Sequence, residues 1–451
     1  MKNVILIFFI SITLSCSFDN KTGIWKDISN IKVDNSSVES IEANTSATRY
    51  EDIFIKNKIF NEEVNVSNNF FSKLEVPIRI ENWSEQYGAK TNNISNFYYN
   101  GSKKILSKSS KLSRLSLKKN LIFYKNNLIN FDHKGAIFIY STSQKKKIFK
   151  FNFYKKKFKN VKKQIYLLVN DNVLYAADNL GYIYAIDVKN KSLIWAKNYG
   201  IPFRSNLKFA DGQIFLANQD NVIYSINAKT GNKNWQYSTN LTFLKSDFKN
   251  NFAIDEFNKN LFFLNTNGEF YSINYLNRKI NWVLNLKNSA LPGDTSLFLS
   301  QPIVIKKKNL IISIKNTILN YNTLNGSINW SLLSNTRLKP ILTTNYAYIL
   351  SNKDLLICVD NKTGQVLWSQ NIYNNLEEKI RIKKIGKFFD LKMINNEINI
   401  FSKNGYLLSF NHKNGKILNI KKISKKGINS EIVVLKDNIF LVDNNNRLLK
   451  F

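Results

Sequence analysis

The chain has 451 residues, with 66 Lys and Arg against 32 Asp and Glu, and a formal net charge of +34 at pH 7. So large a charge raises the hypothesis of a nucleic-acid partner. Lys, Asn, Ile and Phe are abundant together along the whole chain, however, which indicates a general composition bias, so we expect no nucleic acid. The lysines then form either a solvated surface or one attracted to anionic membranes.

Residues 1–15 have the pattern of a signal peptide. Lys2 gives a positive start, Val4 to Ile12 form an apolar run too short to span a bilayer, and Thr13-Leu14-Ser15-Cys16 follows. A small residue before Cys resembles the cleavage site of bacterial lipoproteins, which implies that Cys16 is acylated and becomes the mature N-terminus. The alternative is an ordinary secretory signal with an incidental Cys. The only other cysteine is Cys358, so with Cys16 acylated no disulfide can form and the fold relies on its packed core.

Residues 16–75 are polar, rich in Asn, Ser and Lys, and have no sustained hydrophobic period. This composition predicts a tether. Phe70, Phe71 and Leu74 are the residues that we expect to anchor a short segment of it on the domain that follows, residues 76–451.

From residue 186 onward one unit recurs: an apolar run, an Asn/Asp turn, and Trp at a fixed offset. The Trp residues are spaced by 38 to 48 residues, which is the period of a four-stranded propeller blade. A sixth copy has Asn419 in the Trp position, and a weaker upstream copy has Phe149 there. The five tryptophans are Trp195, Trp235, Trp282, Trp330 and Trp368.

The copy that ends at Trp368 shows the expected local structure. Tyr346–Ser351, Leu355–Val359 and Gln365–Trp368 read as three strands of a meander, and Asp360-Asn-Lys-Thr-Gly364 reads as an Asx-type turn. A large flat ring in the same place in every blade fills the wedge between neighbouring sheets, so we interpret the five tryptophans as structural inter-blade residues. The alternative is that one of them lines a cofactor pocket.

The repeat therefore predicts an all-β fold, an eight-bladed β-propeller of four-stranded antiparallel blades, with seven blades as the alternative. The last copy ends at Phe451 without a fourth strand. We expect a strand from before residue 120 to complete it, either Pro77–Glu81 or Ile94–Tyr99, because such pairing closes the ring without an open sheet edge.

The sequence offers little catalytic chemistry. His133 and His412 lie in separate turns with no Cys, His or carboxylate at ligand spacing, and no phosphate-binding loop or nucleotide fingerprint occurs. We therefore predict no enzyme activity, no metal and no cofactor.

From about residue 120 to 451 the repeat resembles that of quinoprotein-like propellers. One branch of that superfamily holds dehydrogenases that bind pyrroloquinoline quinone (PQQ) with calcium, typically with an adjacent-cysteine disulfide, which this chain lacks. The order of signal, Cys, tether and propeller resembles the other branch, the non-catalytic BamB lipoproteins of the outer-membrane β-barrel assembly machinery.

The second resemblance implies a lipid-anchored scaffold on the periplasmic face of the outer membrane, with proteins of the barrel-assembly complex as partners. In that family an inter-blade loop with an Arg docks on the central barrel subunit. The matching loop here is Gly200–Ser205, which implies partner contacts by Phe203 and Arg204. The alternatives are a PQQ-dependent oxidoreductase and a lipoprotein of another envelope complex.

Overall fold

The computed structural model describes residues 59–66, 73–154, 158, 160–240, 251–286, 300–314, 316–374, 376 and 382–451, and the backbone of two short strands near the N-terminus. The chain divides into two compact units, residues 1–56 and 57–451. In the first unit β1 (Cys16–Phe18) pairs antiparallel with β2 (Trp25–Asp27). The signal peptide, Phe70 and Phe71 lie outside the described residues.

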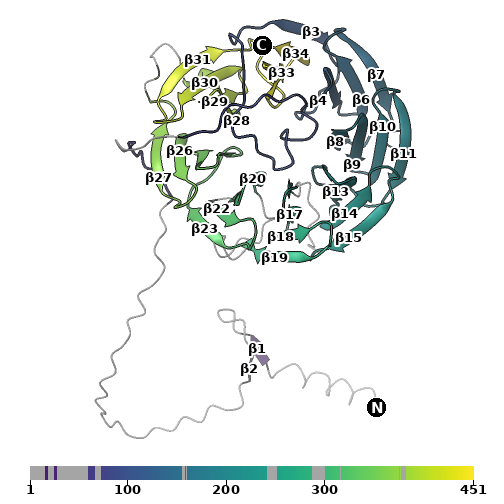
Figure 1. Cartoon of the computed structure of the whole chain (residues 1–451), viewed down its shortest axis with the longest axis horizontal. Helices are drawn as coiled ribbons and strands as arrows, with labels where there is room; N and C mark the ends of the chain where they lie inside the picture. Colours follow the sequence, from purple (N-terminus) through teal and green to yellow (C-terminus); the bar gives the residue numbers. More distant parts are fainter. Residues whose placement is uncertain are drawn as a thin grey trace, which may run out of the picture. The chain divides into compact units, whose positions relative to one another are not determined.

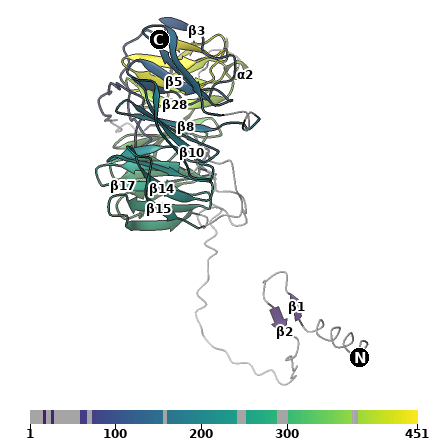
Figure 2. The same cartoon turned by 90° about the vertical axis from the view of Figure 1, so that its right-hand side faces the viewer.

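The second unit is a ring of eight four-stranded antiparallel sheets, which we call blades 1 to 8 in chain order (Figure 1). The prediction of eight blades is confirmed. Figure 2 shows the same ring from the side. The strands of blades 1 to 4 are β4 (Ile122–Tyr124), β5 (Asn127–Phe131), β6 (Ala136–Ser141) and β7 (Lys146–Asn152); β8 (Ile165–Asn170), β9 (Val173–Asp178), β10 (Tyr182–Asp187) and β11 (Ser192–Asn198); β12 (Lys208–Ala210), β13 (Gln213–Ala217), β14 (Val222–Asn227) and β15 (Lys233–Ser238); β16 (Asn251–Asp255), β17 (Asn260–Leu264), β18 (Glu269–Asn274) and β19 (Ile280–Asn285).

The second half of the ring repeats this plan, and the one helix among the described residues, α2 (Ile382–Ile385), precedes blade 7. The strands of blades 5 to 8 are β20 (Val304–Lys306), β21 (Asn309–Ile314), β22 (Thr317–Asn322) and β23 (Ile328–Leu332); β24 (Ile341–Leu342), β25 (Tyr346–Leu350), β26 (Leu355–Asp360) and β27 (Val366–Asn371); β28 (Phe388–Ile394), β29 (Glu397–Ser402), β30 (Tyr406–Asn411) and β31 (Ile417–Lys422); β32 (Val433–Leu435), β33 (Asn438–Val442), β34 (Arg447–Lys450) and β3 (Ser107–Lys111).

The ring closes in blade 8, where the polar strand β3 pairs with the edge of β34. An N-terminal strand therefore completes the last blade, as the sequence predicted, but the strand is Ser107–Lys111. The prediction of Pro77–Glu81 or Ile94–Tyr99 as that strand is wrong. Those two segments lie inside the ring instead, joined by a parallel bridge between Ile78 and Phe97.

Residues 77–100, which we call the axial segment, pass through the middle of the ring (the dark blue trace in Figure 1). Successive residues of this segment bond to blade 8 and then to blades 1 through 7, so the chain makes one full circuit of the inner strands. The hydrogen bonds in that order are Lys436 N to Ile80 O (2.9 Å), Trp83 N to Phe123 O (2.8 Å), Val169 N to Ser84 O (2.7 Å), Lys208 Nζ to Glu85 Oε2 (2.6 Å), Ile254 N to Lys90 O (2.9 Å), Ile305 N to Thr91 O (3.1 Å), Asn93 Nδ2 to Leu342 O (2.7 Å) and Phe97 N to Met393 O (2.9 Å).

A second N-terminal stretch, residues 59–66, lies on the outer edge of the ring. Val64 and Ser369 exchange two backbone hydrogen bonds of 3.0 Å each, which adds this stretch to the edge of β27. Phe60 N donates to Leu333 O at 2.7 Å, so the stretch also reaches blade 5. Leu74 packs against the core between blades 6 and 7, as expected for an anchor. The part of the chain that contacts the ring therefore begins before residue 76, where the domain was expected to start.

The hydrophobic core is distributed between the blades. Among the described residues, six of the seven buried clusters join strands of two neighbouring blades, as between Leu216 of blade 3 and Ala185 of blade 2, and the seventh joins blades 7, 8 and 1 with the axial segment. Such a core follows from sheets whose two faces are both covered by other sheets.

Candidate functional site

The segment Gly200–Ser205, expected to be a docking loop, leads into β12, the inner strand of blade 3. Phe203 forms a bridge with Asn218, directly after the second strand, as Leu117, Thr336 and Ile428 do at the same place in their own blades. The Phe203 side chain is fully buried, and its ring meets those of Tyr199 at 5.9 Å and Tyr224 at 6.0 Å. Phe203 therefore cannot offer its ring to a partner, and that part of the prediction is wrong.

Arg204 directly follows this bridge and lies on the face of the ring where the chain enters the inner strands. Its backbone N–H donates to Ala217 O at 2.9 Å, and Ser205 Oγ accepts from Ala217 N at 2.7 Å, so the backbone on both sides is fixed. The side chain is half-buried. A partner contact by Arg204 stays a prediction. The corresponding residues of blades 1 and 6 are also cations, Lys118 and Arg337.

The five tryptophans lie between consecutive blades. The indole Nε1 of Trp195 donates to Ala228 O of the next blade at 3.1 Å, and that of Trp330 donates to Asn361 O at 3.0 Å. Each of these rings faces the turn of the next blade. A Cβ on that blade's turn glycine would lie 2.4 to 2.8 Å from the Trp side chain at Gly231, Gly326, Gly364 and Gly415.

Phe149 and Asn419 occupy the same register position as the tryptophans. Phe149 pairs with Ile139 and Asn419 with Ser409, next to a β-bulge between the third and fourth strands, as Trp368 does with Cys358. The sequence-based assignment of both residues to the Trp position is therefore confirmed. Cys358 is fully buried, and burial raises the pKa of its thiol above the ordinary range.

Charged side chains meet on the inner strands and the axial segment. Lys208 is fully buried and bonds to Glu85 at 2.6 Å. Burial lowers the pKa of Lys208, while the charge of Glu85 opposes that shift. Lys392 lies 3.3 Å from Asp390, and its ammonium group is 5.3 Å from the centre of the Trp83 ring.

Lys339, which precedes β24, completes this group. Burial, followed by repulsion from Lys392, lowers the pKa of Lys339 to about 7. Asp390 and Glu431 act in the opposite direction, because they favour the charged ammonium form. Lys208 and Lys392 are therefore each paired with a carboxylate, whereas Lys339 forms no ion pair with a described carboxylate.

These residues do not fit a calcium and quinone site. No group of three His, Cys, Asp or Glu side chains in the described part of the chain could hold a metal ion. The inner carboxylates of Glu85 and Asp390 are already paired with Lys208 and Lys392. The sequence has no adjacent cysteines.

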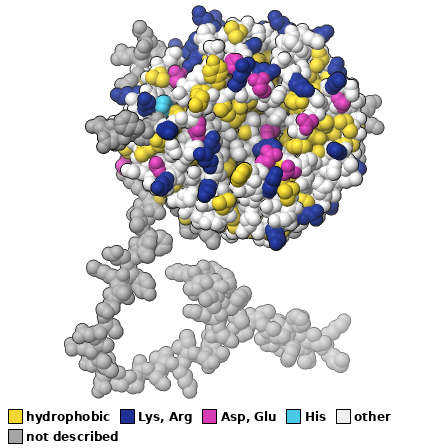
Figure 3. Space-filling model, viewed as in Figure 1, with side chains coloured by type: hydrophobic (Ala, Val, Ile, Leu, Met, Phe, Trp, Pro, Cys, Tyr) yellow, Lys and Arg dark blue, Asp and Glu magenta, His cyan; other side chains and the backbone are white. Residues whose placement is uncertain are grey.

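Lys and Arg side chains are spread over the face shown in Figure 3, without a single continuous basic stripe there. Cys16 belongs to β1, and its side chain is outside the described residues. No helix in the described ranges is long and apolar enough to cross a membrane.

Fold, repeat and inter-blade tryptophans together define an eight-bladed propeller built from PQQ-like repeats. The chain belongs to the family described as outer membrane protein assembly factor BamB, whose model matches residues 145–370 and 258–451.

Individual relatives are distant. The outer membrane protein assembly factor BamB of Legionella pneumophila (strain Paris) is 26% identical over 72 residues, which is 16% of this chain and 18% of that protein. The matched stretch thus spans less than a fifth of that relative.

Two solved structures show the shared fold. The crystal structure of BamB from Moraxella catarrhalis superimposes with a TM-score of 0.59 at 12% identity, covering 77% of this chain and 98% of that one. Quinohemoprotein alcohol dehydrogenase from Comamonas testosteroni gives a TM-score of 0.62 at 9% identity, covering 83% and 81%.

Proposed function

We propose that this protein is a non-catalytic scaffold in outer-membrane β-barrel assembly, lipid-anchored through Cys16 at the periplasmic face of the outer membrane, with proteins of the assembly complex as partners. The observation that carries the proposal is the family match across the repeats, since the family is that of an outer-membrane protein assembly factor.

The inner strands support a binding role over a catalytic one. The axial segment bonds to all eight blades, and the inner carboxylates of Glu85 and Asp390 are used in ion pairs within the chain. A ligand entering along the axis from the side of this segment would have to displace it. A rigid ring with loops around its rim suits partners that dock on the surface.

Arg204 is the residue that we propose for partner contact. A partner carboxylate that reaches the half-buried Arg204 side chain would form a charge-assisted hydrogen bond with its guanidinium group. Phe203 then acts indirectly, because its buried ring holds the backbone that presents Arg204.

Affinity purification of the membrane-anchored protein from its own cells tests the proposal. We expect the central barrel-assembly subunit to co-purify, and palmitate labelling to be lost in Cys16→Ala. A quinone absorbance band after reconstitution with quinone and calcium, without co-purification, would instead indicate an oxidoreductase.

Binding of the purified pair then tests the contact. Arg204→Ala should weaken the complex by about 2 kcal/mol, as expected for an interface hot spot. Arg114→Ala is the matched control, because Arg114 is an exposed Arg in the connection between β3 and β4. Equal affinities for both variants would exclude Arg204 as a contact while leaving the co-purification result standing.

A further inference from the structure

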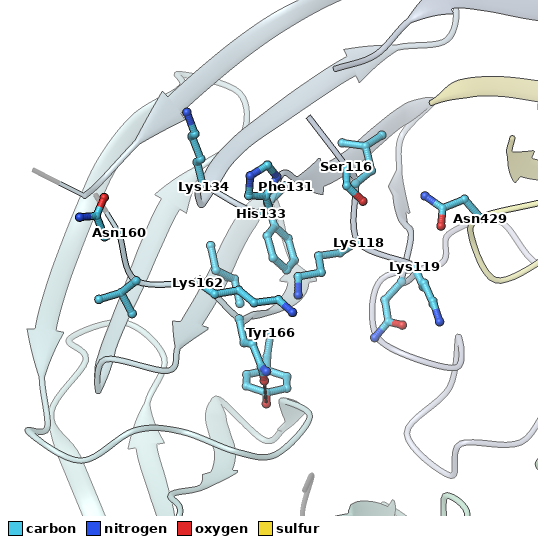
Figure 4. A pocket seen from close by; sticks show the side chains of 15 residues that line it. Ser116, Lys118, Lys119, Phe131, His133, Lys134, Asn160, Lys162, Tyr166 and Asn429 are labelled. Carbon is cyan, nitrogen blue, oxygen red and sulfur yellow. Dashed lines mark hydrogen bonds between the residues drawn. The ribbon is translucent and has the colours of Figure 1, made fainter. Parts of the chain in front are cut away.

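A cavity of about 820 Å³ opens where the chain enters the inner strands of blades 1, 2 and 8. Four lysines line it: Lys118 and Lys119 before β4, Lys134 in the turn between β5 and β6, and Lys162 before β8. Figure 4 shows the ammonium groups of Lys118 and Lys162 pointing into the same space. The rings of Phe131 and Tyr166 form apolar parts of the wall.

The positive charge of this cavity is not compensated within the described chain. No described Asp or Glu lines it, and none of the four lysines forms an ion pair with a described carboxylate. Lys118 is half-buried, and its pKa is lowered by burial and then by the charges of Lys162 and Lys119. Like charges held this close repel one another.

Elsewhere the same chain supplies a counterion for a comparable cation. Arg337 holds the position in blade 6 that Lys118 holds in blade 1, and it bonds to Asp354 at 2.5 Å in the turn between the second and third strands. In blade 1 the corresponding turn residue is Gly135, with Lys134 beside it. A Cβ at Gly135 would lie 2.3 Å from the ring of Tyr154, so the packing leaves no room for a carboxylate there.

One further polar group is unused at this cavity. The Nδ1 atom of His133 is buried and has no hydrogen-bond partner among the described residues. Two ammonium groups, those of Lys118 and Lys162, thus face one space beside an unused imidazole nitrogen, and the exposed Lys119 and Lys134 lie at its edge.

We propose that this cavity binds the phosphate group of an anionic ligand, either a lipid headgroup or a soluble phosphate compound. A phosphate carries up to two negative charges and has several acceptor oxygens. It can therefore accept hydrogen bonds from more than one ammonium group at once, whereas a carboxylate has fewer acceptor oxygens and one charge. The apolar wall accommodates the organic part of such a ligand. The site lies apart from Arg204, on other blades, and does not depend on the proposed partner contact.

Titration calorimetry of the full chain with inorganic pyrophosphate, and co-sedimentation with phosphatidylcholine vesicles with or without phosphatidylglycerol, test this proposal. The variant is Lys118→Gln, Lys119→Gln, Lys162→Gln. The control is Lys383→Gln, Lys384→Gln, Lys387→Gln, which changes the net charge equally at three exposed lysines before blade 7.

We expect pyrophosphate to bind the wild type, and its affinity to fall at least tenfold in the cavity variant but not in the control. If the cavity variant also loses binding to phosphatidylglycerol vesicles, the natural ligand is a lipid headgroup; if vesicle binding is kept, it is a soluble phosphate. The proposal is overturned if pyrophosphate does not bind, or if both variants lose affinity equally, since that would indicate general surface charge. Melting temperatures without ligand verify that both variants are folded.

Discussion

The outer rim of this propeller differs between two arcs. Over blades 5 and 6, residues 59–66 cover the outer strands, and Trp330 and Trp368 are only 6% and 0% exposed. Over blades 2 to 4, Trp195, Trp235 and Trp282 occupy the same register position but are half-buried. Neighbouring outer-strand residues such as Leu193 and Ile194 are about half exposed.

The comparison shows that the repeat alone does not decide how deeply its Trp is buried. The next blade covers one side of every ring, but complete burial also requires chain from outside the repeat. The inner rim is different, because the axial segment reaches all eight blades alike. The uncovered arc is therefore the part of the rim with apolar surface left for other molecules.

The largest expected effect is the loss of stability when a Trp is removed from the covered arc, compared with the uncovered arc. Trp368→Ala should lower the free energy of unfolding by about 3–5 kcal/mol, as large-to-small changes in a packed core do. Trp195→Ala should cost less, roughly 2 kcal/mol, because part of that side chain is already exposed to water. Urea unfolding measures both. Equal costs would mean that the outer cover adds nothing to the energetics.

The turn glycines that face the tryptophans provide a second test of the difference between the covered and uncovered arcs. Gly364→Ala should cost about 3 kcal/mol, because it combines a positive φ of 76° with a Cβ 2.4 Å from Trp330, whose ring is held in place. Gly212→Ala is the control, since its φ of 72° is similar but nothing lies within 4 Å of the added Cβ, and it should cost about 1 kcal/mol.

Gly231→Ala adds the test of the uncovered arc. Its Cβ would lie 2.6 Å from Trp195, which has solvent on one side and can shift. We expect a cost between those of Gly364→Ala and Gly212→Ala. A cost as large as that of Gly364→Ala would contradict the view that the uncovered rings are less constrained.

A third prediction removes the cover itself. Val64→Pro deletes the N–H that bonds to Ser369 O, so residues 59–66 should detach from β27, with a loss of about 1–3 kcal/mol. Val64→Ala keeps the N–H and should change stability less. Acrylamide quenching of Trp fluorescence should increase in the Pro variant only, because Trp368 becomes accessible. Unchanged quenching in both would show that other residues bury that ring.

Sequence reasoning succeeded where the repeat itself carries the signal. The Asn/Asp turn and the residue at the Trp offset recur in each copy, so Phe149 and Asn419 could be placed without a Trp. The pairing of Trp with small residues, such as Ala185, Ser225 and Cys358, is a further signal that was present in the sequence.

It failed where contacts depend on the backbone. Strand β3 reads Ser-Lys-Ser-Ser-Lys, which has no apolar alternation because most of it is exposed at the blade edge. The axial segment bonds through peptide groups and Asn side chains, which leave no hydrophobic period. Phe203 looked like a loop residue because its bridge to Asn218 is a single pair. Its offset from the Asx turn, shared with Leu117 and Ile428, could have revealed the burial.

The smallest expected effect concerns the inner rim. The axial segment covers all eight blades there, so the inner positions differ mainly in the charge of their side chains. The pKa of Lys339 is about 7 in the folded protein, against an ordinary value near 10.5, because of burial and repulsion from Lys392. Between these two values the unfolded chain binds more protons than the folded one, so this group makes stability rise with pH across that window. Below pH 7 both states are protonated, and the buried charge destabilises the fold at a constant level.

Lys339→Met removes this titration. The variant should therefore melt above the wild type at pH 6, and the difference should shrink as the pH rises to 9, because wild-type Lys339 then loses its proton only in the folded state. Lys383→Met replaces an exposed lysine of α2, before blade 7, and its melting difference from the wild type should not change with pH. A melting difference that does not change with pH would mean that Asp390 and Glu431 keep Lys339 charged throughout, so that the inner charges are fully compensated.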